Sequence, residues 1–287
     1  MKKIAFVGVG LIGGSFALEI KLLYPQAQLI GIDKNKENIQ EALDLKIIDK
    51  KGTIDDVACA DMVLISIPVD NIPEVLSDIL ARVKEQTLVI DMGSTKAEIC
   101  QSVENHPKRN QFLAAHPIAG TEYSGAKSAF RGLFAGKTMI VCEVEKTSFA
   151  LQEKALDLFQ KIGMRIRYMN PVMHDKHIAY VSHLSHVISY MLGKTVMEKE
   201  ASEKDIFDMA GSGFASTVRL AKSSASMWVP IFKQNRNYLL ECLKEYIENL
   251  HQFEQLLAAE NYSRIFDQID QINQIKDILN GKNIQIK

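Results

Sequence analysis

Three glycines near the start of the chain, Gly8, Gly10 and Gly13, lie between a short apolar run and a segment with helical character. In a strand–turn–helix, the first glycine permits the tight turn and the second lets the backbone approach a pyrophosphate. The third lets the helix pack closely on the strand. The helix would begin at Leu11 and Ile12 and present its positive end to the phosphates. The chain is therefore expected to begin as the first unit of a dinucleotide-binding fold.

A second apolar run, 27–33, ends at Asp33, about 20 residues after Gly13. A carboxylate at this position bonds the ribose hydroxyls of NAD and repels the 2′-phosphate of NADP. Lys34 and Lys36 lie just beyond it and leave NADP as a weaker alternative. We therefore predict NAD as the cofactor, and a glycine-rich turn without a ligand is the less favoured interpretation.

The first half of the chain alternates short apolar runs with helical segments, which predicts a Rossmann-type doubly wound α/β sheet. Several runs are continuously apolar, as expected for parallel strands that are covered on both faces. The predicted strands are 2–9, 27–33, 60–68, 87–93, 111–116, 137–144 and 165–169.

The second half of the chain has a different pattern, because strand signals stop after Asn170-Pro171. A chain of 287 residues also exceeds the usual size of one hydrophobic core. We predict a dinucleotide-binding domain over 1–170 and an all-helical substrate and dimerisation domain over 171–287. The predicted helices are 173–199, 202–210, 214–225, 228–259 and 261–280.

The predicted helix 228–259 is the reason to expect a homodimer. A helix of this length buries its apolar stripe poorly in one small monomer, although a simple helical packing domain is the alternative. The stripe consists of Ile231, Tyr238, Leu239, Cys242, Tyr246, Leu250, Phe253 and Leu257.

The composition argues against several classes of partner. The 34 basic and 35 acidic residues leave a net charge of -1, with no basic block for nucleic acid or an anionic membrane. No apolar stretch reaches the roughly 18 residues of a membrane span. The four cysteines have no paired short spacing, so we expect neither a zinc site nor disulfides and predict a cytoplasmic protein.

Residues that follow later strands are expected at the same sheet edge as the glycine loop, because ligands bind at the carboxyl ends of the strands in this architecture. Ser66 and Pro68 follow one predicted strand, and Gly93 and Ser94 follow the next. We predict that Ser66, Pro68 and Gly93 contact the cofactor.

His116 is the leading candidate for a catalytic base. It ends the run 111–116, and an imidazole titrates near neutral pH. Oxidation of an alcohol needs a hydride acceptor and a base that takes the hydroxyl proton. Ser94 is expected at the start of the helix that follows the fourth predicted strand, where its hydroxyl could bond both substrate and His116. Each has a plainer interpretation, as a structural strand-end histidine and as a helix N-cap.

Polar residues of the helical half could receive a substrate. His183 and His186 in VSHLSH lie three apart on one helix face, where they could bind an anion or simply be packed. The same helix lacks an acid or cysteine in register, so we expect no metal. In GSGFASTVRLAKSS, Arg219 suits a bidentate hold on a carboxylate with Lys222 nearby, although an ordinary solvated arginine is the alternative.

Together these residues resemble the prephenate dehydrogenase family, which includes arogenate and cyclohexadienyl dehydrogenases. The resemblance extends over nearly the whole chain. It rests on VGVGLIGGS at the start, DMGSTK at 91–96, HPIAGTEYSG at 116–125, VSHLSH at 181–186 and GSGF…RLAKS…MW over 211–228.

The resemblance implies NAD-dependent oxidative decarboxylation of prephenate to 4-hydroxyphenylpyruvate in tyrosine biosynthesis. His116 would take the 4-hydroxyl proton while Ser94 orients that hydroxyl. Arg219 would hold one of the two carboxylates, with His183, His186 and Lys222 completing the pocket. It also implies that Thr121 and Glu122 close over the substrate.

One position departs from the family pattern and bears on the arginine. Ser216 occupies the place, three residues before Arg219, where many relatives have an acid, which puts an ion pair to the arginine in doubt. An arogenate dehydrogenase is the nearest alternative function. A β-hydroxyacid dehydrogenase would rely on a catalytic lysine instead of HPIAGTE, and a non-catalytic NAD-sensing protein would not need His116, Ser94 and Arg219 together.

Overall fold

The computed structural model describes residues 1–281. Residues up to Leu239 form one compact unit, and the described residues from Leu240 onward form a second. The cavities and contacts discussed below all lie within the first unit.

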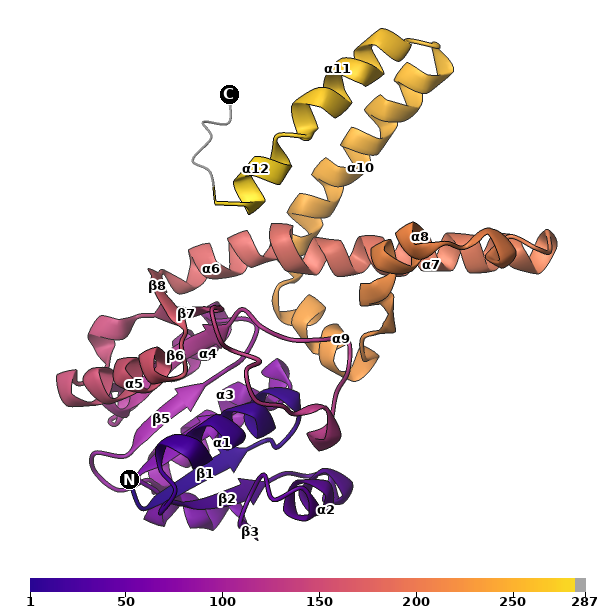
Figure 1. The fold of residues 1–287 in the computed structure, drawn as a ribbon. Helices are drawn as coiled ribbons and strands as arrows, with labels where there is room; N and C mark the ends of the chain where they lie inside the picture. Colours follow the sequence, from indigo (N-terminus) through magenta and orange to yellow (C-terminus); the bar gives the residue numbers. More distant parts are fainter. Residues whose placement is uncertain (282–287) are drawn as a thin grey trace. The chain divides into compact units, whose positions relative to one another are not determined.

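A single sheet forms the centre of the first unit (Figure 1). Within residues 1–281 it has eight strands in the order β3-β2-β1-β4-β5-β6-β7-β8. β1 to β6 are parallel, whereas β7 runs antiparallel to β6 and pairs in parallel with β8. The strands are β1 (Lys3–Val7), β2 (Gln28–Ile32), β3 (Lys50–Lys51), β4 (Met62–Ile65), β5 (Leu88–Asp91), β6 (Phe112–Pro117), β7 (Thr138–Cys142) and β8 (Arg165–Met169).

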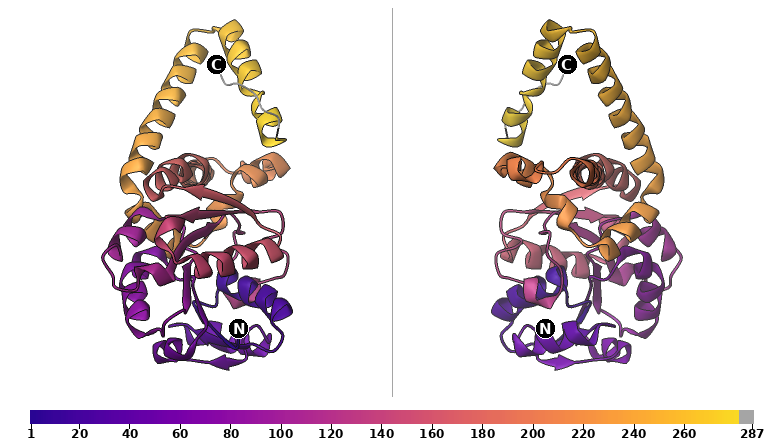
Figure 2. Two further views of the ribbon diagram at one scale, coloured as in Figure 1. Left: turned by 90° about the vertical axis from the view of Figure 1, so that its left-hand side faces the viewer. Right: turned by 90° about the vertical axis from the view of Figure 1, so that its right-hand side faces the viewer.

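Helices cover both faces of this sheet (Figure 2), which confirms the predicted doubly wound fold. Side chains alternate along β1, so Ile4 and Phe6 join one core while Ala5 and Val7 join the other. The first face is covered by α1 (Leu11–Leu23), α2 (Lys36–Asp44) and α5 (Phe149–Lys161). The second is covered by α3 (Ile72–Arg82), α4 (Ala97–Ser102) and α9 (Ala225–Gln234).

The described residues after β8 are mainly helical, as predicted. Asn170 caps the first of these helices, because its side chain accepts hydrogen bonds from the backbone amides of Val172 and Met173. The remaining elements are α6 (Pro171–Ile178), a π-helical turn (Ala179–His183), α7 (Leu184–Ser202), α8 (Ser212–Thr217), a 3₁₀ turn (Arg219–Lys222), α10 (Arg236–Ala258), α11 (Tyr262–Ile272) and α12 (Ile275–Leu279).

The predicted single helix 228–259 is wrong. α9 ends at Gln234, Asn235 leaves the helical conformation at φ -100° and ψ 22°, and α10 begins at Arg236. The side chain of Asn235 is buried and forms hydrogen bonds to α6 and to the π-helical turn. These hydrogen bonds stabilise the break. No glycine or proline stands at the break, so the sequence carries no ordinary signal for it.

The other helical predictions also change in detail. The segment 202–210 forms only a 3₁₀ turn at Phe207–Met209, and 214–225 is divided between α8 and the 3₁₀ turn that holds Arg219. The segment 261–280 is divided into α11 and α12, and 173–199 contains the π-helical turn. α9 packs on the sheet core, so the compact units of the single chain divide at Leu239 and not at Pro171. A division into two functional domains at Pro171 remains a prediction.

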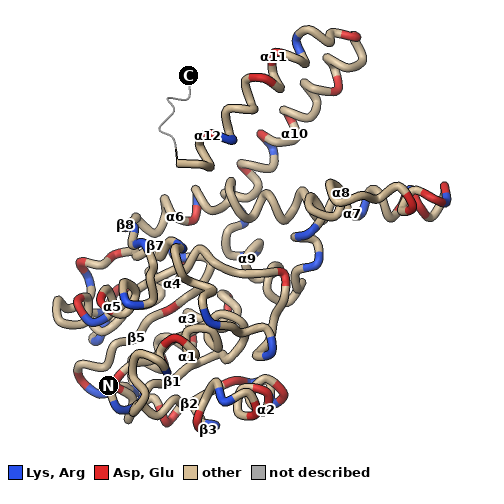
Figure 3. Tube along the Cα trace, viewed as in Figure 1, with Lys and Arg blue, Asp and Glu red and all other residues tan. Residues whose placement is uncertain are grey.

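The second unit exposes many large apolar side chains for its size. They lie on α10, α11 and α12 and include Leu250, Phe253, Leu257, Phe266, Ile269 and Ile272. In the described residues no helix has the length and hydropathy needed to cross a bilayer. Lysine and arginine are distributed over many elements of both halves of the chain (Figure 3).

A fully buried ion pair lies at the carboxyl edge of the sheet. Lys96 Nζ contacts Asp91 Oδ1, and both side chains have no exposed surface. The same ammonium donates to the backbone oxygen of Ala115 at 2.8 Å, while Asp91 Oδ1 accepts from the amide of Gly93 at 2.9 Å. Burial raises the pKa of Asp91, and the nearby lysine opposes that shift. The pair therefore joins the ends of β5 and β6.

We expect Lys96→Met to lower the free energy of unfolding by about 3–5 kcal/mol, because it leaves a buried carboxylate without its partner. Urea unfolding at fixed protein concentration measures the loss. Lys84→Met is a matched control, because Lys84 pairs with Asp61 at 2.8 Å on the surface and should lose about 1 kcal/mol or less. Equal small losses in the two variants would contradict a structural role for the buried pair.

Candidate active site

A cavity of about 1310 Å³ lies at the carboxyl ends of the parallel strands. One end is formed by the glycine loop and β2, and the other by the π-helical turn, the 3₁₀ turn before α9, and α9 itself. Most of the predicted site residues line it: Gly8, Gly10, Leu11, Ile12, Asp33, Ser66, Pro68, Gly93, Ser94, His116, Thr121, His183, His186 and Arg219. Gly13, Glu122 and Lys222 are not part of the lining.

The glycine loop has the geometry that a bound pyrophosphate requires. Gly8 has φ +93°, and an added Cβ would lie 2.4 Å from the backbone oxygen of Ser66. A Cβ on Gly13 would lie 2.1 Å from the backbone oxygen of Gly8, so this glycine serves helix packing. A Cβ on Gly10 would meet nothing within 4 Å, although Gly10 lines the cavity. The backbone of Gly10 is thus open to a ligand.

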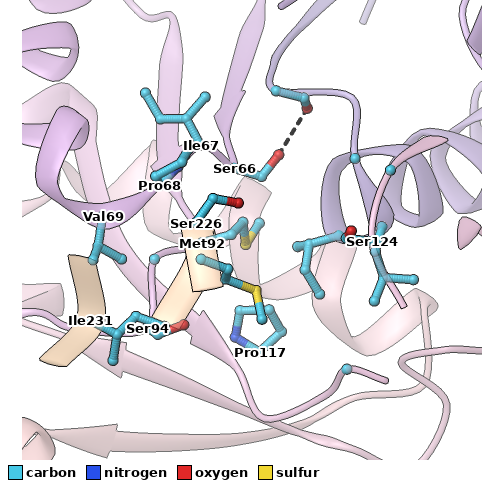
Figure 4. A pocket seen from close by; sticks show the side chains of 18 of the residues that line it. Ser66, Ile67, Pro68, Val69, Met92, Ser94, Pro117, Ser124, Ser226 and Ile231 are labelled. Carbon is cyan, nitrogen blue, oxygen red and sulfur yellow. Dashed lines mark hydrogen bonds between the residues drawn. The ribbon is translucent and has the colours of Figure 1, made fainter. Parts of the chain in front are cut away.

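Ser66 supports this loop from the neighbouring strand. Its hydroxyl donates to the backbone oxygen of Gly8 at 2.9 Å, the dashed contact in Figure 4. Figure 4 also shows Ser66 to Val69 on one side of the cavity and Ser124 across from them. Ser66 therefore holds the loop shape, in addition to lining the predicted cofactor groove.

Asp33 is held in place at the far end of the groove. Its Oδ2 accepts from the amide of Val9 at 3.1 Å, and its Oδ1 accepts from the amide of Asn35 at 2.8 Å. Other residues that line the cavity could not be recognised from the sequence, because they carry no charge or motif that marks them. They are Asn38, Thr53, Ile54, Asn71 and Val75.

His116 is held by a chain of hydrogen bonds that the sequence did not reveal. Its Nδ1 lies 2.8 Å from Nε2 of His174, and Nδ1 of His174 lies 2.7 Å from Oδ1 of Asp175. The carboxylate of Asp175 also accepts from the amides of Lys96 at 2.7 Å and Ala97 at 2.9 Å, at the start of α4. His116, His174 and Asp175 are each nine-tenths or more buried.

This chain sets the proton positions on both rings. A carboxylate only accepts, so His174 carries its proton on Nδ1. When this is the only proton on the His174 ring, its Nε2 accepts, and the proton of neutral His116 lies on Nδ1. The Nε2 lone pair of His116 is then free to take a proton in the cavity. Burial, followed by the proximity of His174 and Lys96, holds the pKa of His116 well below its usual range, so the ring is neutral.

Ser94 lines the same cavity, but not as the sequence analysis expected. α4 begins at Ala97 with Lys96 as its N-cap, so Ser94 lies in the loop before the helix and not at its start. Ser94 and Ile231 both line the cavity, and Figure 4 labels their side chains. Within the described residues no hydrogen bond joins Ser94 to His116, so any contact between them is expected through a substrate.

Two histidines of the helical segment line the end of the cavity opposite the glycine loop. His183 belongs to the π-helical turn, an irregularity often found at functional sites, and His186 stacks on Trp228 with ring centroids 3.4 Å apart. Burial lowers the pKa of His183 to about 4, and burial also lowers the pKa of His186. Both rings are neutral near pH 7 and offer hydrogen bonds rather than positive charge. Trp228 was missed as a site residue, since a single tryptophan reads equally well as core.

Arg219 has a carboxylate partner despite Ser216. Its Nη1 lies 3.0 Å from Oε2 of Glu122, which follows Thr121 in the loop after β6. A backbone hydrogen bond and then the guanidinium lower the pKa of Glu122, with a smaller contribution from Lys222. Lys222 therefore acts on Glu122 electrostatically rather than from the cavity wall. Among the described residues, no three His, Cys, Asp or Glu side chains are grouped as a metal site requires.

Family models match both halves of the chain. Residues 16–168 match the nucleotide-binding domain of prephenate dehydrogenase. Residues 170–271 match the dimerization domain of prephenate dehydrogenase.

Individual relatives agree with these matches. A prephenate dehydrogenase of Bacillus subtilis is 30% identical over 92% of this chain and 72% of its own length. The crystal structure of the Aquifex aeolicus prephenate dehydrogenase in complex with hydroxyphenyl propionate and NAD+ has a TM-score of 0.88 at 30% identity, covering 97% of this chain and 98% of that one. The Synechocystis arogenate dehydrogenase structure has a TM-score of 0.75 at 25% identity, covering 96% and 99% of the two chains.

We expect His174→Phe to let the proton of neutral His116 occupy either ring nitrogen, because the Nδ1–H of His116 loses its acceptor. Nitrogen NMR of protein with ¹⁵N-labelled histidine, recorded at about pH 8 where the rings are neutral, should show one Nδ1–H tautomer for His116 in the wild type. The variant should show a mixture of both tautomers. His177→Phe on the exposed side of α6 is the control and should leave the signal unchanged. A wild-type proton on Nε2 would refute the hydrogen-bond chain.

Proposed function

The chain belongs to the prephenate dehydrogenase family, and we propose that it oxidises prephenate with NAD and releases the ring carboxylate as carbon dioxide, giving 4-hydroxyphenylpyruvate. The observation that carries the proposal is the position of His116, whose Nδ1 lies 2.8 Å from His174 and which lines the same cavity as the glycine loop and Arg219. On this proposal, a proton acceptor, a dinucleotide groove and a cation that binds a carboxylate surround one space.

The dinucleotide groove fits NAD. The open backbone of Gly10 and the first turn of α1 suit a pyrophosphate, and the fixed carboxylate of Asp33 suits the two ribose hydroxyls. Pro68 and Gly93 line the stretch of groove toward His116. When bound there, NAD supplies the hydride acceptor for the oxidation.

His116 is the proposed general base. Its Nε2 accepts the proton of the substrate's C4 hydroxyl, and the hydrogen bond to His174, which Asp175 orients, stabilises the positive charge that develops on the ring. A base with a lowered pKa is fully in its accepting form at neutral pH. Ser94 is proposed to orient the same hydroxyl from the loop after β5, the strand next to β6.

The carbonyl formed at C4 makes the departure of the ring carboxylate favourable. The carboxylate then belongs to a vinylogous β-keto acid, so the electron pair of the broken C–C bond enters the ring as carbon dioxide leaves. The ring becomes aromatic in the same step, which drives the reaction forward.

Arg219 is proposed to hold a substrate carboxylate. Its planar fork has several donors, and Glu122 occupies Nη1. Glu122 and Thr121 lie on one loop, so loss of the Glu122 contact would free the guanidinium as the loop rearranges around the substrate. Neutral His183 and His186 complete this end by hydrogen bonding, with Lys222 outside the wall.

We also propose a homodimer in the cytoplasm. The exposed apolar side chains of α10 and α11, together with the match of residues 170–271 to a dimerization domain, support the dimer. Arogenate is the second candidate substrate, supported by the likeness to the Synechocystis arogenate dehydrogenase. Prephenate and arogenate differ only where a keto group replaces an amino group, away from the proposed reacting carbon.

The decisive assay follows reduced-cofactor formation with prephenate and with arogenate, each with NAD and NADP. We expect turnover with prephenate and NAD. A preference for arogenate would replace the substrate, and a preference for NADP would contradict the role of Asp33. Dinucleotide binding without turnover in any combination would favour the non-catalytic NAD-sensing alternative.

We expect His116→Ala to leave NAD affinity nearly intact and to lower turnover by about 100- to 10,000-fold, as loss of a general base does.

The pH profile of kcat/KM for the wild type is a second test of His116. The base must be unprotonated, and the pKa of His116 lies well below its usual value of 6.5. We therefore expect kcat/KM to stay constant from neutral pH to pH 6.5 and to decrease only at lower pH. A fall centred at or above pH 6.5 would exclude His116 as the base.

A further inference from the structure

Asn235, at the break between α9 and α10, reaches back to the π-helical turn of the active site. Asn235 is only 2% exposed. The side-chain Nδ2 lies 2.7 Å from the backbone oxygen of Asp175 and 3.0 Å from Nδ1 of His183. A backbone oxygen only accepts, so the nitrogen of the amide, and not its oxygen, must occupy this position. Its two hydrogens are then donated to Asp175 and His183.

These contacts determine where His183 carries its proton. Nδ1 accepts from Asn235, so the single proton of the neutral ring lies on Nε2. His183 has no exposed surface and lines the cavity, and Nε2 has no hydrogen-bond partner among the described residues. An unpaired buried donor is costly, so the acceptor oxygen of a ligand is its natural partner.

We propose that Asn235 is a positioning residue that keeps the proton of His183 on Nε2, so that His183 serves as an uncharged hydrogen-bond donor to an oxygen of the substrate. This inference rests on the proposed function, because it assigns that oxygen to the substrate of the same cavity. Carbonyl and carboxylate oxygens are the acceptors that such a donor recognises.

An uncharged donor suits this place better than a cation. His183 is close enough to His116 to contribute to its lowered pKa, so a full positive charge on His183 would weaken the proposed base further. Burial lowers the pKa of His183 to about 4, with His174 and His186 acting in the same direction and Asp175 opposing them. The ring thus stays neutral at neutral pH.

The test compares Asn235→Asp, Asn235→Ala and the wild type, with Asn237→Asp as the matched control on the exposed side of α10. Nitrogen NMR of ¹⁵N-histidine protein, with the His183 signals assigned by their loss in His183→Gln, reads the proton position directly. We expect the wild type to carry the proton on Nε2. In Asn235→Asp the new carboxylate accepts a hydrogen bond, so Nδ1 should become protonated, whereas Asn235→Ala only removes the donor.

Kinetics then test the consequence for the substrate. Asn235→Asp should raise the KM for prephenate by about tenfold, the size expected for one neutral hydrogen bond, and should change kcat less. Asn237→Asp should match the wild type in both measurements.

The outcomes separate this proposal from the proposed function. A wild-type His183 with its proton on Nδ1 overturns the positioning role and needs no variant to fold. An unchanged proton position and KM in Asn235→Asp overturns it as well. The expected wild-type spectrum in a protein that does not oxidise prephenate supports the proton assignment while rejecting the proposed substrate.

Discussion

The carboxylate of Asp175 is the contact on which the arrangement of the site depends. It accepts from the amides of Lys96 and Ala97 at the start of α4, and from the ring of His174 on its own helix. The first pair of bonds fixes α6 against the nucleotide-binding sheet, and the third orients His174 toward His116. One buried anion thus joins the helical segment to the sheet and sets the proton on the proposed base. The N-terminus of α4 stabilises the anion, because the free amides there are partly positive.

Burial gives the site its electrostatic character. His116, His183 and His186 all have lowered pKa values, chiefly because their rings are removed from water. The three histidines therefore act through hydrogen-bond direction. The direction at His183 is set by the amide nitrogen of Asn235, which only donates, and the direction at His186 by the backbone oxygen of Ser182, which only accepts. At His116 the direction is set through His174 by the carboxylate of Asp175. Arg219, the proposed cation for a substrate carboxylate, is half exposed and paired with Glu122. In the proposed mechanism the neutral histidines add no positive charge beside His116.

Much of the nucleotide half could be predicted, since its signals are local. The glycine loop, Asp33 and the strand-end position of His116 depend on spacings of a few residues and on the rule that parallel strands end at one edge. The hydrogen-bond chain could not be predicted in this way. His174 lies 58 positions from His116, and Asn235 lies 52 positions from His183 and 60 from Asp175. No periodicity links such residues, and a buried Asn, His or Asp looks in sequence like any polar helical residue.

The sequence by itself determined the doubly wound sheet, the dinucleotide groove and the residue types available for chemistry, because backbone geometry and side-chain alternation act over short distances. AAHPIAG places His116 at the sheet edge for that reason. Only the tertiary structure decided that burial lowers the pKa of His116, that its Nδ1 faces His174, that Arg219 pairs with Glu122, and that the long helix breaks at Asn235. These properties depend on desolvation and on single hydrogen bonds between distant segments, and they exist only once the chain has packed.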